Sequence, residues 1–146
     1  LPVSFGVENR AGTRNAPSLA NVAYQVKLLR EGSLPTLEMQ VLVPVQEHNE
    51  FDFSLLFIAE RLKNNPEYVD LCRKAYDRDP DPYTITRALS AFQRTLISGE
   101  APFDRWYFQG DASAVPEAAR RGFELFQSER LGCAQCHNGF LLTNQE

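Results

Sequence analysis

The stretch RRGFELFQSERLGCAQCHNGF, residues 120–140, joins an apolar helical face to a closely spaced pair of cysteines. The apolar residues of that face recur at helical spacing, and they are Ala119, Phe123 and Phe126. Pro116 suits the first position of such a helix, where its missing N–H costs nothing. The pattern therefore predicts a helix that leads directly into the pair Cys133 and Cys136.

Residues 133–137, CAQCH, match the C-x-x-C-H pattern by which haem c is attached to proteins. Two thiols three positions apart on a helical turn can both reach the edge of one porphyrin, and the adjacent imidazole can coordinate its iron. We therefore expect Cys133 and Cys136 to anchor haem c through thioether bonds. We expect His137 to be an axial ligand of the haem iron.

Two other uses of a C-x-x-C pair fit the sequence less well. A zinc site needs four ligands, and apart from His137 only His48 and Cys72 remain as Cys or His. A thioredoxin-like redox pair follows a strand in a βαβ unit, whereas this sequence has no alternating strand pattern. Cys72 lies on an apolar helical stripe, where we expect it to be a small buried hydrophobe.

The composition is that of one or two small globular domains, since the 146-residue chain is 43% hydrophobic and 23% charged. A net charge of −4 and a pI near 5.2 argue against nucleic-acid binding, because the 15 Lys and Arg are scattered rather than clustered. No apolar run approaches the roughly 20 residues that a membrane-spanning helix needs. We therefore expect neither a nucleic-acid partner nor a membrane span.

Apolar periodicity predicts an all-α chain with long irregular connections. Residues 1–25 read as irregular, and a short helix follows and stops near Pro44. Three longer helices are predicted by apolar stripes, which are Leu55, Ile58, Ala59 and Leu62; Tyr68, Cys72, Ala75 and Tyr76; and Ile85, Ala88, Leu89, Phe92 and Leu96. Thr84 is expected to cap the last of these helices, which is expected to end near Gly99.

Several blocks of sequence resemble those of di-haem cytochrome c peroxidases, in the same order along the chain. They are RNAPSL at residues 14–19, the segment 89–102 with its AFQRTL, PFDR at residues 102–105, and the helix and haem motif at residues 120–140. The resemblance implies cytochrome-c-like helical domains and two c-type haems in the intact protein. It also implies reduction of hydrogen peroxide to water with electrons from a small cytochrome or cupredoxin donor.

The resemblance further implies a domain organisation. Residues 1–110 would be the remainder of the first, peroxidatic domain with inter-domain helices, and residues 111–146 would begin the second, electron-accepting domain. The first haem motif and the second haem's other axial ligand would then lie outside the chain, so we expect a fragment that is inactive alone. Because haem c is attached outside the bacterial cytoplasm, the resemblance implies a periplasmic protein, and it allows a homodimer.

The loop PVQEHNE, residues 44–50, resembles the family's P-I-Q-N-P-x-E, whose Glu works at the peroxidatic haem. The resemblance puts Glu50 on that catalytic Glu and Gln40 on a Gln of the same pocket. A carboxylate there can accept a proton from the inner oxygen of peroxide and deliver it to the outer one. Without the resemblance, Glu50 in a polar loop reads as an ordinary solvated side chain.

Two further positions carry implications of the resemblance. Asn15 matches an Asn whose side-chain oxygen helps to bind calcium, although a local hydrogen bond in a turn explains an Asn equally well. Residues 30–33, REGS, stand where many peroxidases have W-D-G-R, so the tryptophan assigned to inter-haem electron transfer is missing. This departure keeps a second function open: an electron-transfer haem protein, or a relative that oxidises a protein partner, like those that mature methylamine dehydrogenase.

Overall fold

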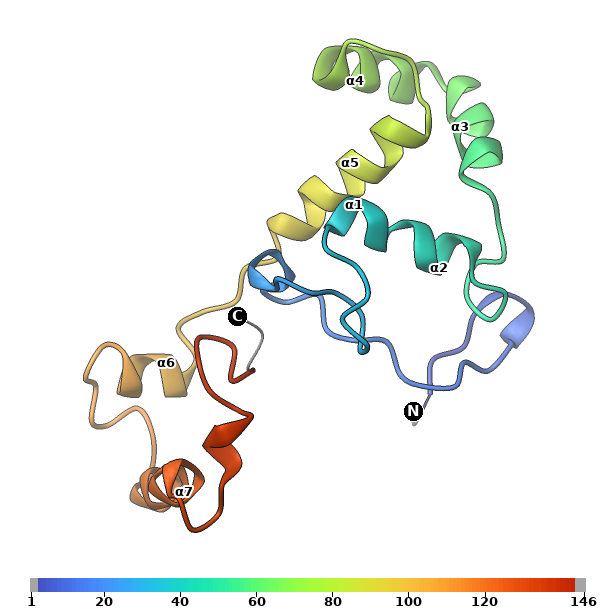
Figure 1. Cartoon of the computed structure of the whole chain (residues 1–146). Helices are drawn as coiled ribbons and strands as arrows, with labels where there is room; N and C mark the ends of the chain where they lie inside the picture. The colour runs from blue at the N-terminus through green and yellow to red at the C-terminus, as the bar shows by residue number, and fades with distance from the viewer. Residues whose placement is uncertain (1–2, 144–146) are drawn as a thin grey trace. The chain divides into compact units, whose positions relative to one another are not determined.

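The computed structural model describes residues 3–143, and the chain forms two compact units, Leu1–Ile97 and Ser98–Glu146 (Figure 1). Within the described residues the regular elements are helices, and the β contacts are two isolated bridges in the first unit. The predicted all-α class is therefore confirmed. The boundary expected after residue 110 concerns the domains of the intact protein and stays a prediction.

The described part of the first unit holds two 3-10 turns and five α-helices. In chain order they are η1 (Val7–Asn9), η2 (Val22–Tyr24), α1 (Leu37–Gln40), α2 (Leu42–Gln46), α3 (Leu55–Lys63), α4 (Pro66–Tyr76) and α5 (Pro82–Arg94). The helix expected to stop near Pro44 instead continues to Gln46. Pro44 is tolerated because it lies in the first turn of α2, where its nitrogen owes no intrahelical hydrogen bond.

Helices α3 and α4 follow one another along the chain (Figure 1), and each begins at an N-cap side chain, Ser54 for α3 and Asn65 for α4. The stripe predicted for α3 is confirmed, since Leu55 and Ala59 are buried and their two partners are half-buried. The stripe predicted for α4 is partly wrong, because Tyr68 is exposed, whereas Val69, which was not in the stripe, is half-buried like Cys72. Cys72 is half-buried rather than fully buried, because α4 buries none of its side chains completely.

Helix α5 begins at Pro82, and its N-cap is Asp81 rather than the expected Thr84. The Asp81 Oδ1 accepts the Thr84 N–H at 2.8 Å, and the Thr84 hydroxyl accepts the Asp81 N–H at 3.0 Å. Thr84 is thus the third helical residue of a capping box, and Pro82 occupies the first. The helix ends at Arg94, five residues before the expected stop at Gly99.

The apolar stripe predicted for α5 is only partly correct, because Ile85 lies in the core whereas later members of the stripe do not. Leu89 and Phe92 are 44% and 60% exposed, whereas Thr86, Ser90 and Gln93 are buried. The hydroxyls of this buried face bond back to the helix itself, with Thr86 Oγ1 donating to the Pro82 carbonyl and Ser90 Oγ to the Thr86 carbonyl. Because those polar groups are already satisfied, their burial leaves no unpaired hydroxyl.

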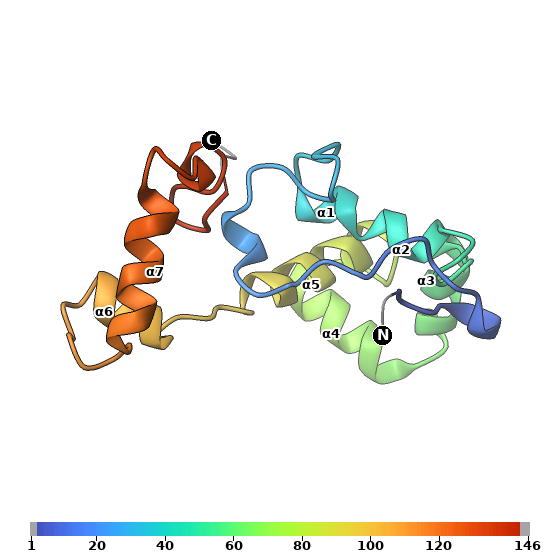
Figure 2. The same ribbon diagram turned by 90° about the horizontal axis from the view of Figure 1, so that it is seen from below.

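Two apolar clusters hold the first unit together. The larger consists of buried Val45, Leu55, Ala59 and Ile85, with Leu42, Ile58 and Leu62 packed against them. The smaller consists of Val22, Leu28 and Leu37. Helix α1 lies against α5 in both views (Figures 1 and 2), and Glu38 pairs there with Arg94 through two hydrogen bonds of 2.8 and 3.3 Å. This contact fixes the helix that carries Gln40.

The second unit contains α6 (Pro102–Tyr107), α7 (Glu117–Gln127) and the 3-10 turn η3 (Cys133–Gln135). Pro116 is the N-cap of α7, one position before the expected site. Aromatic rings join the two helices: Phe123 of α7 lies 5.3 Å from Phe103 and 5.5 Å from Trp106 of α6, measured between ring centroids. Edge-to-face packing of this kind favours a fixed crossing of the two helices.

The helices in the described range are too short and too polar to cross a bilayer.

Candidate functional site

The two thiols and the imidazole of residues 133–137 lie on one turn. Gly132 starts this turn with φ +66°, a conformation that glycine adopts at little cost. The N–H groups of Cys136 and His137 then donate to the Cys133 carbonyl at 3.2 and 2.9 Å. Cys133 is half-buried, Cys136 is exposed, and both are free thiols. Both thiols are therefore available to form a covalent bond with another group.

The orientation of His137 is set by a main-chain carbonyl. Its Nδ1 lies 3.2 Å from the carbonyl oxygen of Leu142. A carbonyl oxygen only accepts, so Nδ1 carries the proton of this hydrogen bond, and Nε2 is the ring nitrogen that could bind a metal. Metal-binding histidines are commonly oriented in this way, by a hydrogen bond from the other ring nitrogen.

An apolar cavity of about 380 Å³ lies beside this turn. Its lining consists of Phe103, Trp106, Val115, Ala119, Gly122, Phe123, Phe126 and Leu142. Two of these residues also contact His137: Phe126, whose ring centroid is 6.3 Å from that of the imidazole, and Leu142, through its carbonyl. At Gly122 a Cβ atom would meet nothing within 4 Å, so the missing side chain widens the space on this face of α7.

These residues fit haem c. Two accessible thiols at the required spacing, an imidazole whose Nε2 could bind iron, and an aromatic cavity beside them match the needs of a covalently tethered porphyrin. A zinc site fits less well, because no cluster of three or more His, Cys, Asp or Glu side chains occurs within residues 3–143.

Glu50 lies in the turn that follows α2, with its side chain exposed. Its main chain is fixed by the N-terminal segment, since the Glu50 carbonyl accepts the Val7 N–H at 2.7 Å. Gly6 packs directly on the same turn: a Cβ at Gly6 would lie 2.6 Å from the Glu50 Cα and nearer still to the carbonyl oxygens of residues 49 and 50. Residue 6 therefore has no room for a side chain.

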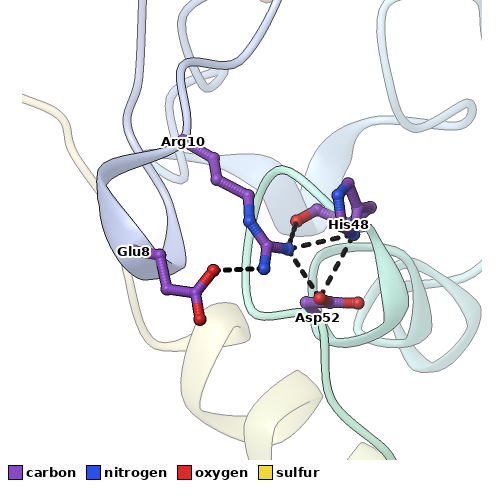
Figure 3. Close-up of polar contacts among 4 residues, drawn as sticks. All are labelled: Glu8, Arg10, His48 and Asp52. Carbon is purple, nitrogen blue, oxygen red and sulfur yellow. Dashed lines mark hydrogen bonds and ion pairs between the residues drawn. The ribbon is translucent and has the colours of Figure 1, made fainter.

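One arginine ties this turn to the N-terminal segment (Figure 3). Arg10 Nη1 donates to the His48 carbonyl at 2.8 Å and to Asp52 Oδ2 at 2.6 Å, while Nη2 bonds the Glu8 carboxylate. These contacts lower the pKa of the Asp52 carboxyl, chiefly through the Arg10 hydrogen bond, and raise the pKa of Arg10 itself. Asp52 is therefore held in its charged form.

Gln40 is half-buried on α1 and is paired with Gln93 of α5. Its side-chain oxygen accepts the Gln93 amide N–H at 3.3 Å. The buried Oε1 of Gln93 has no hydrogen-bond partner in the described part of the chain. No hydrogen bond within residues 3–143 joins Gln40 to Glu50, and the hydrogen bonds that Glu50 makes in this range involve its main chain.

Asn15 is hydrogen-bonded to two residues that are distant in the sequence. Its Oδ1 accepts the Ser4 hydroxyl at 2.8 Å, and its carbonyl accepts Arg30 Nη2 at 3.0 Å. The Ser4 hydroxyl in turn accepts the Ala16 N–H at 2.9 Å. These partners of Asn15 lie 11 and 15 positions away, so they are not the local turn hydrogen bond considered from the sequence, and calcium binding stays a prediction.

Gly6, Arg10, Gln93 and the Leu142 carbonyl could not be found from the sequence. Gly6 and Arg10 lie about 40 positions before the turn that they hold, outside any local motif. A carbonyl leaves no trace in a residue pattern at all. The blocks that contain Asn15, Glu50 and the C-x-x-C-H motif did carry a local signal.

A helical chain that carries this motif turn, an oriented imidazole and an adjoining aromatic cavity has the build of a c-type haem protein. The comparison with protein families is more specific, because the model for "Di-haem cytochrome c peroxidase" matches residues 1–113. The chain belongs to this family.

Relatives from both branches of the family resemble the chain. Methylamine utilization protein MauG of Methylorubrum extorquens is 40% identical over 134 residues, 90% of this chain and 37% of that protein. Cytochrome c551 peroxidase of Pseudomonas aeruginosa is 30% identical over 148 residues, 99% of this chain and 42% of that protein. A crystal structure of a MauG-like protein associated with microbial copper homeostasis superposes with a TM-score of 0.87 at 31% identity, over 99% of this chain and 43% of that one. The chain thus spans about two fifths of the length of these relatives.

Proposed function

We propose that the intact protein is a di-haem peroxidase that reduces hydrogen peroxide to water with electrons from a small cytochrome or cupredoxin. The observation that carries this proposal is the motif turn, in which His137 donates its Nδ1 proton to the Leu142 carbonyl and leaves Nε2 as the nitrogen that could bind iron. Family membership adds the reaction class. A periplasmic location follows from where haem c is attached, and calcium at Asn15 and a homodimer remain parts of the proposal.

The second unit would hold the electron-accepting haem. Cys133 and Cys136 would anchor it, His137 would bind its iron through Nε2, and the aromatic side chains of α6 and α7 would enclose its apolar face. When bound, this group supplies one-electron transfer. The protein's own contribution is to hold the two thiols and the imidazole on one turn and to orient the imidazole through the Leu142 carbonyl.

Glu50 would move the proton in the reaction with peroxide. Its exposed carboxylate would accept the proton of the inner peroxide oxygen and return it to the outer oxygen, so that water leaves rather than hydroxide. Gln40 would orient peroxide: its oxygen is engaged by Gln93, so its amide nitrogen is the group left to donate.

A second candidate function is the oxidation of a protein partner. Arg30 stands in place of the tryptophan that many peroxidases carry, and it is bonded to the Asn15 carbonyl. The 40% identity with methylamine utilization protein MauG points the same way. Both candidates share the haem site, and they differ in which substrate is turned over.

Turnover of hydrogen peroxide by the full-length, haem-loaded protein with reduced cytochrome c tests the proposal. Glu50→Gln is expected to lower kcat by about 10² to 10⁴, the range of a lost proton-transfer group. Glu47→Gln, an exposed carboxylate of the same turn, is the matched control and should keep full activity. An unchanged rate in Glu50→Gln would refute its role. A protein with a haem absorption spectrum but no peroxide turnover would favour the second candidate.

A further inference from the structure

The turn that carries Glu50 is held on both sides by a single guanidinium. Arg10 reaches His48, two residues before Glu50, and Asp52, two residues after it (Figure 3). We propose that Arg10 is a positioning residue, which keeps the Glu50 carboxylate at the peroxide by clamping the turn of residues 47–52 onto the N-terminal segment. This inference rests on the role proposed for Glu50.

The clamp acts on the main chain as well as on side chains. The bond of 2.8 Å to the His48 carbonyl fixes the backbone, and the ion pair of 2.6 Å with Asp52 fixes the other end of the turn. Both of these contacts come from Nη1, while Nη2 bonds the Glu8 carboxylate, so one planar group joins the two ends of the turn to the N-terminal segment.

The segment that supplies Arg10 is itself rigidly folded. The Gly6 N–H donates to the Arg10 carbonyl at 2.9 Å, and the Arg10 N–H donates to the Val7 carbonyl at 3.1 Å. This same segment touches the Glu50 main chain, through the Val7 N–H and through the close approach of Gly6. Arg10 therefore clamps the turn onto a surface that already fits it.

Residues on both sides of this contact have left-handed backbone conformations, which need stabilising contacts. Asp52 has φ +48°, and Glu8 and Asn9 have φ +55° and +61°, a left-handed region that residues with side chains enter at a cost. Such conformations persist only where surrounding contacts impose them. Arg10 bonds the side chains of both Glu8 and Asp52, so its loss would release strain on the two sides of the contact at once.

His48 is the weaker partner in the cluster. Its Nδ1 lies 2.9 Å from Arg10 Nη1 and 3.1 Å from Asp52 Oδ2. A single nitrogen cannot accept from the arginine and donate to the carboxylate at the same time. The His48 side chain is also 69% exposed, whereas that of Arg10 is 25% exposed. The more shielded Arg10 is therefore the residue whose removal should matter.

The experiment measures peroxide turnover by the full-length, haem-loaded protein in a double-mutant cycle. Arg10→Gln is expected to lower kcat by about tenfold to hundredfold, as misplacement of a reacting group by about 1 Å does. In a Glu50→Gln background the same change should cost less than about twofold, because the group that Arg10 positions is already lost. Asp52→Asn, which removes the charge at the other end of the clamp, should follow the same pattern.

Arg73→Gln is the matched control, because Arg73 makes an equally short ion pair of 2.6 Å with Asp79 at the end of α4. It should leave turnover unchanged in both backgrounds. Full activity in Arg10→Gln would overturn the inference, and so would an equal loss in the wild-type and Glu50→Gln backgrounds, which indicates a general structural role. Full activity in Glu50→Gln alone would overturn the proposed proton transfer, and the clamp would lose its purpose with it.

Discussion

Gly6→Ala should disable the turn that carries Glu50 without touching any charged group. The new Cβ would lie 2.6 Å from the Glu50 Cα, whereas ordinary contact begins at 3.4 Å. The nearest atom is the Asn49 carbonyl oxygen at 2.1 Å, so the two main chains must separate by about 1.3 Å, since backbone atoms cannot rotate away. A displacement of about 1 Å at a reacting group can cost about 10²-fold in rate.

We therefore expect Gly6→Ala to lower kcat for peroxide by up to about 10²-fold. The overpacking should also reduce the free energy of unfolding by about 1–3 kcal/mol. Stopped-flow turnover with reduced cytochrome c measures the first effect, and urea denaturation of the same haem-loaded protein measures the second. Gly99→Ala is the control, because a Cβ there meets nothing within 4 Å. Normal turnover in Gly6→Ala at normal stability would show that Glu50 does not depend on this contact.

The remaining predictions concern the cavity and the α1–α5 contact. Gly122→Leu should fill the cavity and reduce the haem content of the matured protein, measured as the pyridine haemochrome, whereas Gly122→Ala should load normally; equal loading would place the haem elsewhere. The Arg94 hydrogen bond lowers the pKa of Glu38 below its ordinary value, so this pair stabilises the fold above about pH 4.3, and the gain is lost as the pH falls through the lower folded-state pKa. Glu38→Gln should therefore lower the free energy of unfolding by at most about 1 kcal/mol at pH 7 and leave it unchanged at acid pH. The same difference between the two proteins at neutral and at acid pH would contradict this.

Local patterns predicted the elements well where one face of a helix meets a core within the chain. The stripe of α3 is an example, since Leu55 and Ala59 lie in the larger apolar cluster. The same reasoning held for α5 only at Ile85, because Leu89 and Phe92 of the same predicted stripe are exposed. Periodicity identifies an apolar face but not what covers it, and small hydroxyl residues such as Ser90 can be buried once they bond to their own helix.

The sequence likewise pointed to some residues of the candidate site and missed others. The motif turn was predictable, because its chemistry depends on residues three positions apart. The Glu50 turn was found only through its resemblance to a family block, and the residues that hold it were not found at all. Gly6 and Arg10 act through distant contacts, and a sequence without its folded structure does not reveal which remote segment meets which.

Leu142 does two separate things at the motif turn: its side chain lines the aromatic cavity, and its carbonyl orients His137. Because the carbonyl is common to every amino acid, exchanging this side chain alters the polarity of the cavity wall while the tautomer of the imidazole stays the same. If the proposed haem binds here, such an exchange would change the polarity around it while leaving unchanged the group that orients its imidazole ligand.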